Sequence, residues 1–141
     1  MSTRGFFKNT AKGFTLVEIM IAVGIVSLLG VIALPGLLRA RLSANETFAR
    51  ATLKTISNAC ESYAASNYGQ YPTAMADLIG LAPPYLNQDY TVNPLRGYNF
   101  ACGLLAITGY SCTATPLRCG QTGTKDFTIT TGAVLASVDC I

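Results

Sequence analysis

The sequence predicts an α+β fold, in which a long N-terminal helical spine packs against a small antiparallel sheet of three to four strands. Three observations predict it. Residues 19–38 form an uncharged and almost wholly apolar run. An apolar stripe of helical period follows that run without any loop signal. The last third of the chain holds strand-type segments separated by turn residues, together with four of the five cysteines.

The first thirteen residues have the character of a leader peptide. They carry Arg4, Lys8 and Lys12 and no acidic residue, so they hold all of the formal net charge of +3. The rest of the chain is neutral, which removes the basis for a nucleic-acid-binding function. Basic residues beside an apolar span favour retention on the cytoplasmic side of a membrane. We therefore expect residues 1–13 to be a leader that is cleaved and that takes no part in the fold.

The apolar run is long enough to cross a membrane. Its 20 residues, Ile19 to Leu38, extend about 30 Å as a helix, which matches the hydrocarbon core of a bilayer. We expect residues 14–38 to form a transmembrane helix that becomes a filament core. A secretory signal peptide would be shorter. A plain single-span anchor explains the length but leaves Glu18 unexplained, because a carboxylate is costly in lipid.

Glu18 needs a partner of opposite charge. Cleavage after Gly13 would create a positive amine on Phe14, and in an assembly this amine would neutralise Glu18 of a neighbouring subunit. Pairing within one chain is sterically awkward once the helix forms. The sequence thus predicts that Glu18 fixes the register between adjacent subunits.

The helix continues beyond the membrane run as an amphipathic half, residues 39–68, and ends near Gly69, which suits a left-handed terminus. Its apolar stripe comprises Leu42, Ala49, Leu53, Ile56, Cys60 and Tyr63, while Arg41, Arg50, Lys54, Asn58 and Glu61 fall largely off it. Pro35 is a weak point in the helix interior. Two interpretations stay open: a kinked membrane helix, or a segment that unwinds when subunits pack.

Residues 69–141 are predicted to form a globular head. Thr73 is expected to cap a short helix over residues 74–79, and Pro83-Pro84 ends it. Strands are expected over residues 98–107, 110–114, 127–130 and 133–138, with hairpin turns at Thr108-Gly109 and Thr131-Gly132.

The four late cysteines predict disulfides formed in an oxidising compartment. The turn at Thr108-Gly109 would bring Cys102 and Cys112 face to face, which leaves Cys119 to pair with Cys140. Buried free thiols or a metal site are the alternatives, and the absence of any histidine or CxxC pair disfavours zinc. Cys60 lies on the apolar stripe and is expected to be a buried thiol.

Neither a metal, a cofactor nor an enzymatic activity is expected. The chain has no histidine, the commonest general base, and we find no nucleophile–base constellation. Asp126 and Asp139 alone do not supply the six to eight oxygens of a calcium site.

The string from Lys12 to Val23, KGFTLVEIMIAV, closely resembles the prepilin processing motif of the type IV pilin and type II secretion pseudopilin family. The resemblance implies that a prepilin peptidase cuts after Gly13 and methylates the amine of Phe14. It implies that Glu18 aids recruitment and methylation of the incoming subunit. Pro35 occupies the place of the helix-kinking proline that is common in this family.

The likeness is weaker beyond the motif, where residues 123–127 and 132–135 are similar to the final hairpin of many pilins. By this resemblance the chain is a structural pilin subunit that polymerises with copies of itself into a type IV pilus-like filament. Its partners would be the prepilin peptidase and the inner-membrane assembly machinery. It would be an inner-membrane protein before assembly, and a surface pilus or periplasmic pseudopilus afterwards. A pseudopilin of type II secretion, or a membrane-anchored minor pilin or binding module, remain the alternatives.

Overall fold

The computed structural model of this chain describes residues 13–141, so the predicted leader lies, apart from Gly13, outside the described residues. Two compact units, divided between Leu37 and Leu38, are described separately. The helix α1, Leu16–Ser66, is continuous through both. The second unit adds the short helix α2, Met75–Ile79, and four strands, β1 Tyr98–Ala106, β2 Gly109–Pro116, β3 Lys125–Thr130 and β4 Val134–Asp139. The α+β prediction is confirmed.

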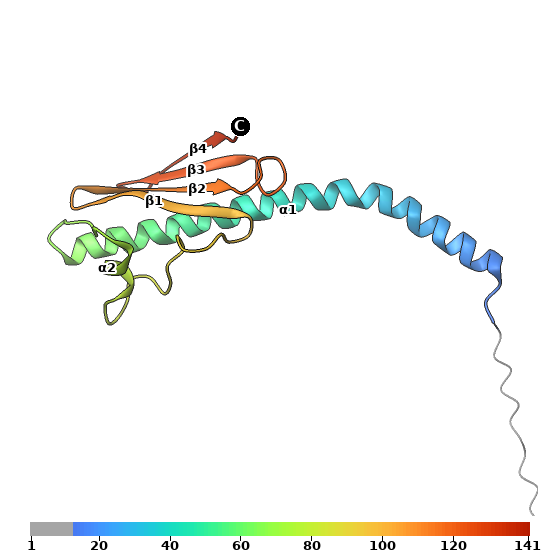
Figure 1. Cartoon of the computed structure of the whole chain (residues 1–141), viewed down its shortest axis with the longest axis horizontal. Helices are drawn as coiled ribbons and strands as arrows, with labels where there is room; N and C mark the ends of the chain where they lie inside the picture. Colours follow the sequence, from blue (N-terminus) through green and yellow to red (C-terminus); the bar gives the residue numbers. More distant parts are fainter. Residues whose placement is uncertain (1–12) are drawn as a thin grey trace, which may run out of the picture. The chain divides into compact units, whose positions relative to one another are not determined.

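The strands form one antiparallel sheet in the order β1-β2-β3-β4, and the sheet lies along one side of the second half of α1 (Figure 1). Both tight connections differ slightly from the prediction. The first hairpin turns at Ile107-Thr108, because Ala106 pairs with Gly109. The second turns through residues 131–133, where Gly132 and Ala133 have positive φ angles, so β4 begins at Val134.

The predicted helical stripe packs against the sheet. Ala49, Leu53, Ile56 and Cys60 recur at steps of three and four residues, and each is fully buried. The strands contribute residues from alternate positions, as expected for a sheet with one buried face. The buried strand residues are Tyr98, Phe100, Tyr110, Cys112, Ala114, Phe127 and Ile129, and Leu78 and Leu86 complete the cluster.

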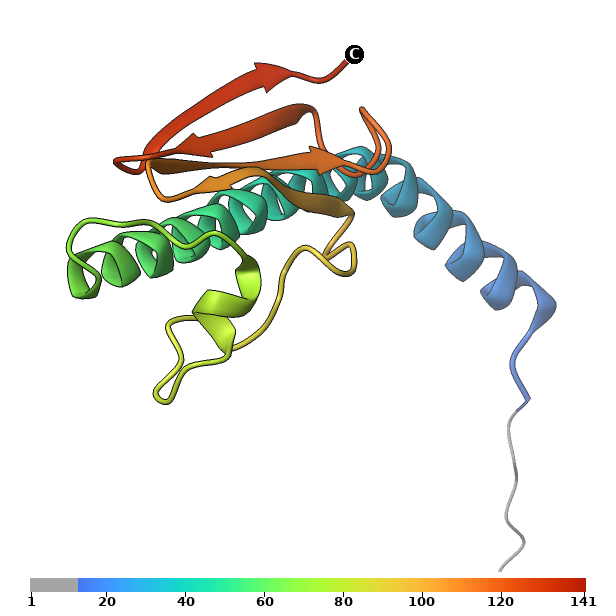
Figure 2. The same cartoon turned by 60° about the vertical axis from the view of Figure 1, so that its left-hand side comes forward.

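The segment between α1 and β1 covers a further side of the second unit, as the turned view makes clear (Figure 2). The helix α1 ends where Tyr68 and Gly69 adopt left-handed conformations, and Gly69 N–H donates to the carbonyl of Ala64. The prediction that Thr73 caps α2 is wrong. The N-cap is Ala74, and the Asp77 carboxylate instead accepts hydrogen bonds from the Thr73 and Ala74 amides.

Glu61, predicted to lie off the stripe, proves to be the main polar link between α1 and the rest of the second unit. Its Oε1 accepts hydrogen bonds from the Tyr110 hydroxyl and the Gly132 amide, each at 2.9 Å. Its Oε2 accepts one from the Tyr71 hydroxyl at 3.0 Å. Because Tyr110 donates its single proton to the carboxylate, the Ser57 hydroxyl, 2.7 Å away, must donate to Tyr110.

This arrangement keeps both tyrosines neutral. Burial, with a contribution from Glu61, raises the pKa of Tyr110 to about 12. The hydrogen bond to Glu61 is the largest cause of the raised pKa of Tyr71. A phenol that must donate to a carboxylate cannot ionise without losing that bond.

We predict that Glu61→Ala lowers the free energy of unfolding by about 3 kcal/mol, because it leaves three donors without their charged acceptor. Glu61→Gln keeps an oxygen for Tyr110 and Gly132 and should lose about half as much. Denaturant unfolding of the full chain in detergent micelles measures both. Ser62→Ala, on the exposed side of the same turn, is the matched control, and an equal effect in all three variants would disprove this role of Glu61.

Cys60 is the one free cysteine among the described residues, and it is fully buried. Burial, with a smaller contribution from the charge of Glu61, raises the pKa of its thiol to about 12. At pH 8 a raised pKa leaves less thiolate, so we predict that iodoacetamide alkylates Cys60 about a thousandfold more slowly than an ordinary thiol. Intact-mass analysis should count one added group after unfolding without reductant and five after unfolding with reductant. Rapid labelling of the folded protein, or a different count, contradicts the assignment.

Candidate functional site

The predicted processing site lies at the start of α1. Gly13 and Phe14 precede the helix, and both are exposed, with 82% of Phe14 accessible. The helix begins at Leu16, directly after Thr15. The bond between Gly13 and Phe14 is therefore outside regular secondary structure and open to a protease.

Thr15 and Glu18 form a reciprocal N-terminal cap. One carboxylate oxygen of Glu18, Oε2, accepts hydrogen bonds from the Thr15 amide at 3.0 Å and the Thr15 hydroxyl at 2.9 Å. The Thr15 hydroxyl oxygen in turn accepts the Glu18 amide at 3.3 Å. This is a capping box, which satisfies two N–H groups that the first helical turn cannot pair internally.

The cap gives Glu18 a bond within its own chain that the sequence interpretation missed. The signal was present, because Thr-x-x-Glu before an apolar run is the capping-box pattern. The bond does not exclude the predicted pairing. Within residues 13–141, the second carboxylate oxygen, Oε1, accepts no hydrogen bond, so it remains available to an amine from another subunit. The pairing itself stays a prediction.

The helix that follows is apolar on every side. Every large hydrophobic residue from Phe14 to Leu38 is between 50% and 82% exposed. In the described part of the chain α1 is the one helix long and apolar enough to span a membrane, with a mean hydropathy of 2.6 in its most apolar window. A helix hydrophobic all round is stable only in lipid or inside a protein assembly.

Pro35 lies inside α1. Because proline has no amide hydrogen, the carbonyl of Val31 loses its helical partner. Helical structure nevertheless continues through Pro35 and Gly36. The glycines Gly24, Gly30 and Gly36 are not required by any close contact in the single chain, because a Cβ added at each would meet nothing within 4 Å. The helix is thus formed in the single chain. A kink at Pro35 in the membrane and unwinding when subunits pack both stay predictions.

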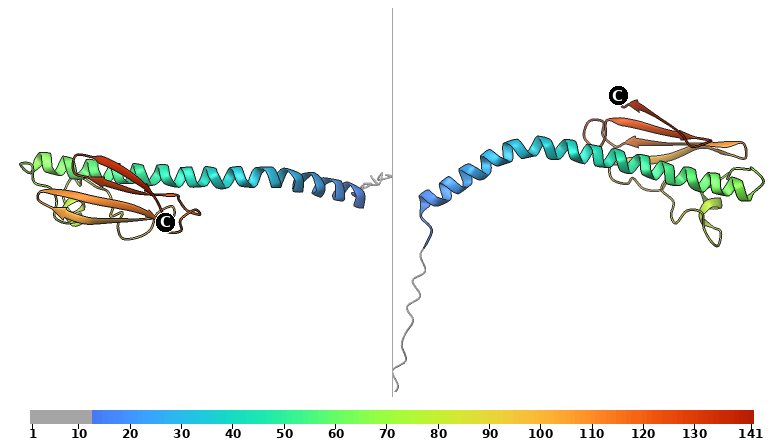
Figure 3. Two further views of the ribbon diagram at one scale, coloured as in Figure 1. Left: turned by 90° about the horizontal axis from the view of Figure 1, so that it is seen from above. Right: turned by 180° about the vertical axis from the view of Figure 1, so that it is seen from behind.

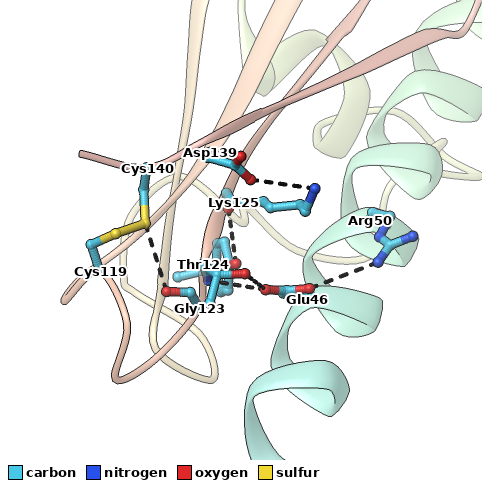
Figure 4. A network of polar contacts seen from close by, with 9 residues as sticks. Glu46, Arg50, Cys119, Gly123, Thr124, Lys125, Asp139 and Cys140 are labelled. Carbon is cyan, nitrogen blue, oxygen red and sulfur yellow. Dashed lines mark hydrogen bonds and ion pairs between the residues drawn. A yellow bond between two sulfur atoms is a disulfide. The ribbon is translucent and has the colours of Figure 1, made fainter. Parts of the chain in front are cut away.

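A second polar site, in the second unit, holds α1 to the loop before β3 (Figure 4). Glu46 Oε1 accepts hydrogen bonds from the Thr124 amide at 2.9 Å and the Thr124 hydroxyl at 2.6 Å. Asn45 donates to the carbonyl of Thr122 at 2.9 Å. On the other side of Glu46, the Arg50 guanidinium lies 3.9 Å away and stacks over the Phe127 ring. No role was predicted from the sequence for Asn45 or Glu46.

The same loop is closed by a disulfide. Cys119 pairs with Cys140, and Cys102 pairs with Cys112 across β1 and β2. These are the pairs favoured from the sequence. The residues described in the structure contain no group of three or more side chains suited to binding a metal ion. The four paired cysteines cross-link strands and a loop of the second unit.

Comparison with known proteins agrees with the N-terminal geometry. Residues 8–34 match the model of the prokaryotic N-terminal methylation motif. The chain is also 39% identical over 73 residues to a type IV wide pilus major component, PilA4, of Thermus thermophilus. That match covers 52% of this chain and 55% of the relative, so the chain spans about half the length of the curated protein that it matches. The motif and this relative together support the type IV pilin family.

Proposed function

We propose that this chain is a structural pilin subunit that polymerises into a type IV pilus-like surface filament after cleavage behind Gly13 and methylation of Phe14. The proposal rests mainly on the N-terminal segment. There the methylation motif covers both the capped start of α1 and the exposed apolar helix that follows it. Before assembly the subunit would cross the inner membrane once. Its partners would be a prepilin peptidase, the assembly machinery and other copies of itself.

Polymerisation follows from the exposed apolar helix. Sixteen large hydrophobic residues between Phe14 and Leu38 are at least half exposed. At roughly 1.5–3 kcal/mol for each fully buried side chain, exposing them to water would cost tens of kcal/mol. Once the subunit leaves the bilayer, this surface is stable only against other apolar helices. Identical subunits arranged head to tail supply such helices in a helical filament.

The free oxygen of Glu18 gives this packing its register. Inside a dry helical core a carboxylate is strongly destabilised unless it is protonated or paired. The amine that cleavage creates on Phe14 is a partner of opposite charge. Because the cap already orients the Glu18 side chain, the amine of a neighbouring subunit meets a fixed acceptor rather than a flexible one.

The alternatives share this N-terminal chemistry and differ in where the filament forms and in abundance. A pseudopilin would form a short periplasmic filament that depends on a secretion system. A minor pilin or membrane-anchored binding module would be a trace component of sheared surface filaments. The relative in Thermus thermophilus is a major pilus component, which favours the major subunit. We infer no enzymatic activity, since the family supported by the comparisons is structural and the chain has no histidine.

We predict that filaments sheared from the native host contain this chain beginning at methylated Phe14, with the leader absent. Intact-mass analysis measures the start of the chain and the methyl group together. Both disulfides should remain intact, so reduction should add the mass of four hydrogens. A mature chain that begins at Met1, or that is cut beyond Arg41, would refute the proposed function.

We predict that Glu18→Val yields a folded, membrane-inserted subunit whose filament yield falls at least about tenfold, because a buried pairing partner is lost. Thr15→Ala removes only the hydroxyl part of the cap and should retain most of the yield. Glu18→Gln should be intermediate, since the amide still caps the helix. Lys54→Glu, on the exposed face of α1, is the charge control. Sheared-filament yield relative to membrane content is the measurement, with Phe14 methylation by mass; normal values in Glu18→Val would exclude the pairing.

A further inference from the structure

The second unit has a positively charged end where α1 enters it. This basal face comprises residues 38–45 at the start of the unit and residues 117–124 in the loop before β3. It contains Arg39, Arg41 and Arg118 and no acidic residue. We infer that the basal face binds the headgroups of anionic phospholipids while the subunit waits in the membrane. This inference rests on the proposed membrane-anchored subunit and adds a lipid partner to it.

The two segments of the basal face are held together by specific bonds. The Asn45 amide donates to the Thr122 carbonyl, and Thr124 donates twice to Glu46. A hollow lies between the two segments and is lined by Leu38, Arg41, Leu42, Gly120 and Gln121. Figure 3 shows the loop beside α1 from two further directions. The arginines are therefore presented on a fixed surface rather than on a flexible tail.

Charge is divided unequally over the second unit. Outside the basal face, residues 46–116 and 125–141 carry four basic and six acidic side chains, a net charge of −2. The nearest acid to the basal face, Glu46, is already bound to Thr124 and lies beside Arg50. The three arginines are all exposed. They are thus free to contact phosphate groups. The rest of the second unit, with its net negative charge, would be repelled by an anionic membrane surface.

Chain connectivity places this face at the membrane. The apolar run ends at Leu38, so Arg39 and Arg41 follow it within one helical turn and fall at the depth of the headgroups. Apolar Leu38 and Leu117, 61% and 56% exposed, flank the arginines and suit the boundary between headgroups and acyl chains. Arginine binds phosphate through two parallel hydrogen bonds. Each basic residue near an anionic surface strengthens binding about fivefold.

Hydrogen exchange of the full chain in nanodiscs tests the inference. We compare zwitterionic phosphatidylcholine discs with discs that contain about one third phosphatidylglycerol, one subunit per disc. Peptides covering residues 38–45 and 117–124 should exchange at least about fivefold more slowly in the anionic discs, and 0.5 M salt should abolish the difference. Peptides from β4 should not change.

Two triple variants separate lipid binding from a general charge effect. Arg39→Gln/Arg41→Gln/Arg118→Gln should reduce the protection below about twofold, whereas Lys54→Gln/Arg96→Gln/Lys125→Gln removes the same charge elsewhere and should retain it. Equal protection in both discs, or equal loss in both variants, overturns the inference. Protection that free phosphate reproduces in zwitterionic discs would also overturn it, because it would indicate binding of a small anion. Protection that requires two subunits per disc would overturn it as well, because it would indicate contact with a second copy. A chain that fails to insert would instead refute the membrane-anchored subunit itself.

Discussion

Two carboxylates on α1 fix how the sheet lies on the helix. Glu46 holds Thr124 just before β3, and Glu61 holds Gly132 just after it. The two acids are fifteen residues apart, which is about 22 Å of helix and close to a whole number of turns. Thr124 and Gly132 are eight residues apart, which is about 26 Å along an extended chain. The two spans are therefore similar in length, and the buried stripe lies between the two attachment points.

This double attachment explains why a modest core suffices. The buried stripe is narrow, and β4 contributes little to it, because five of its six residues are exposed. One disulfide joins β1 to β2 at the buried Cys112. The other joins the end of β4, which the core hardly reaches, to the loop before β3. Covalent closure of such loops stabilises a small domain chiefly by restricting its unfolded chain.

Local and periodic features of the sequence predicted most of the fold. The apolar span, the stripe from Ala49 to Cys60 and the strands between turn residues all leave a pattern of fixed spacing. Glu46 and Glu61 could not be recognised in this way, because their partners in the sheet and its loops, Tyr110, Thr124 and Gly132, lie 49 to 78 residues further along the chain. A polar residue beside an apolar stripe looks the same whether it faces solvent or a distant hydroxyl. At the N-terminal site, Glu18 was singled out for its charge, and its capping role was missed although the Thr15 spacing encodes it.

The cap at Thr15 sets the conformation of the N-terminus independently of its charge. The amide that Glu18 holds belongs to the peptide bond between Phe14 and Thr15, and cleavage behind Gly13 leaves that bond intact. Precursor and mature chain would thus present the same first helical turn. Processing would add a cation at a position whose geometry already exists, so a subunit becomes competent to join its neighbours without refolding. The leader would then prevent the charge pairing until it is removed, and its removal would be irreversible.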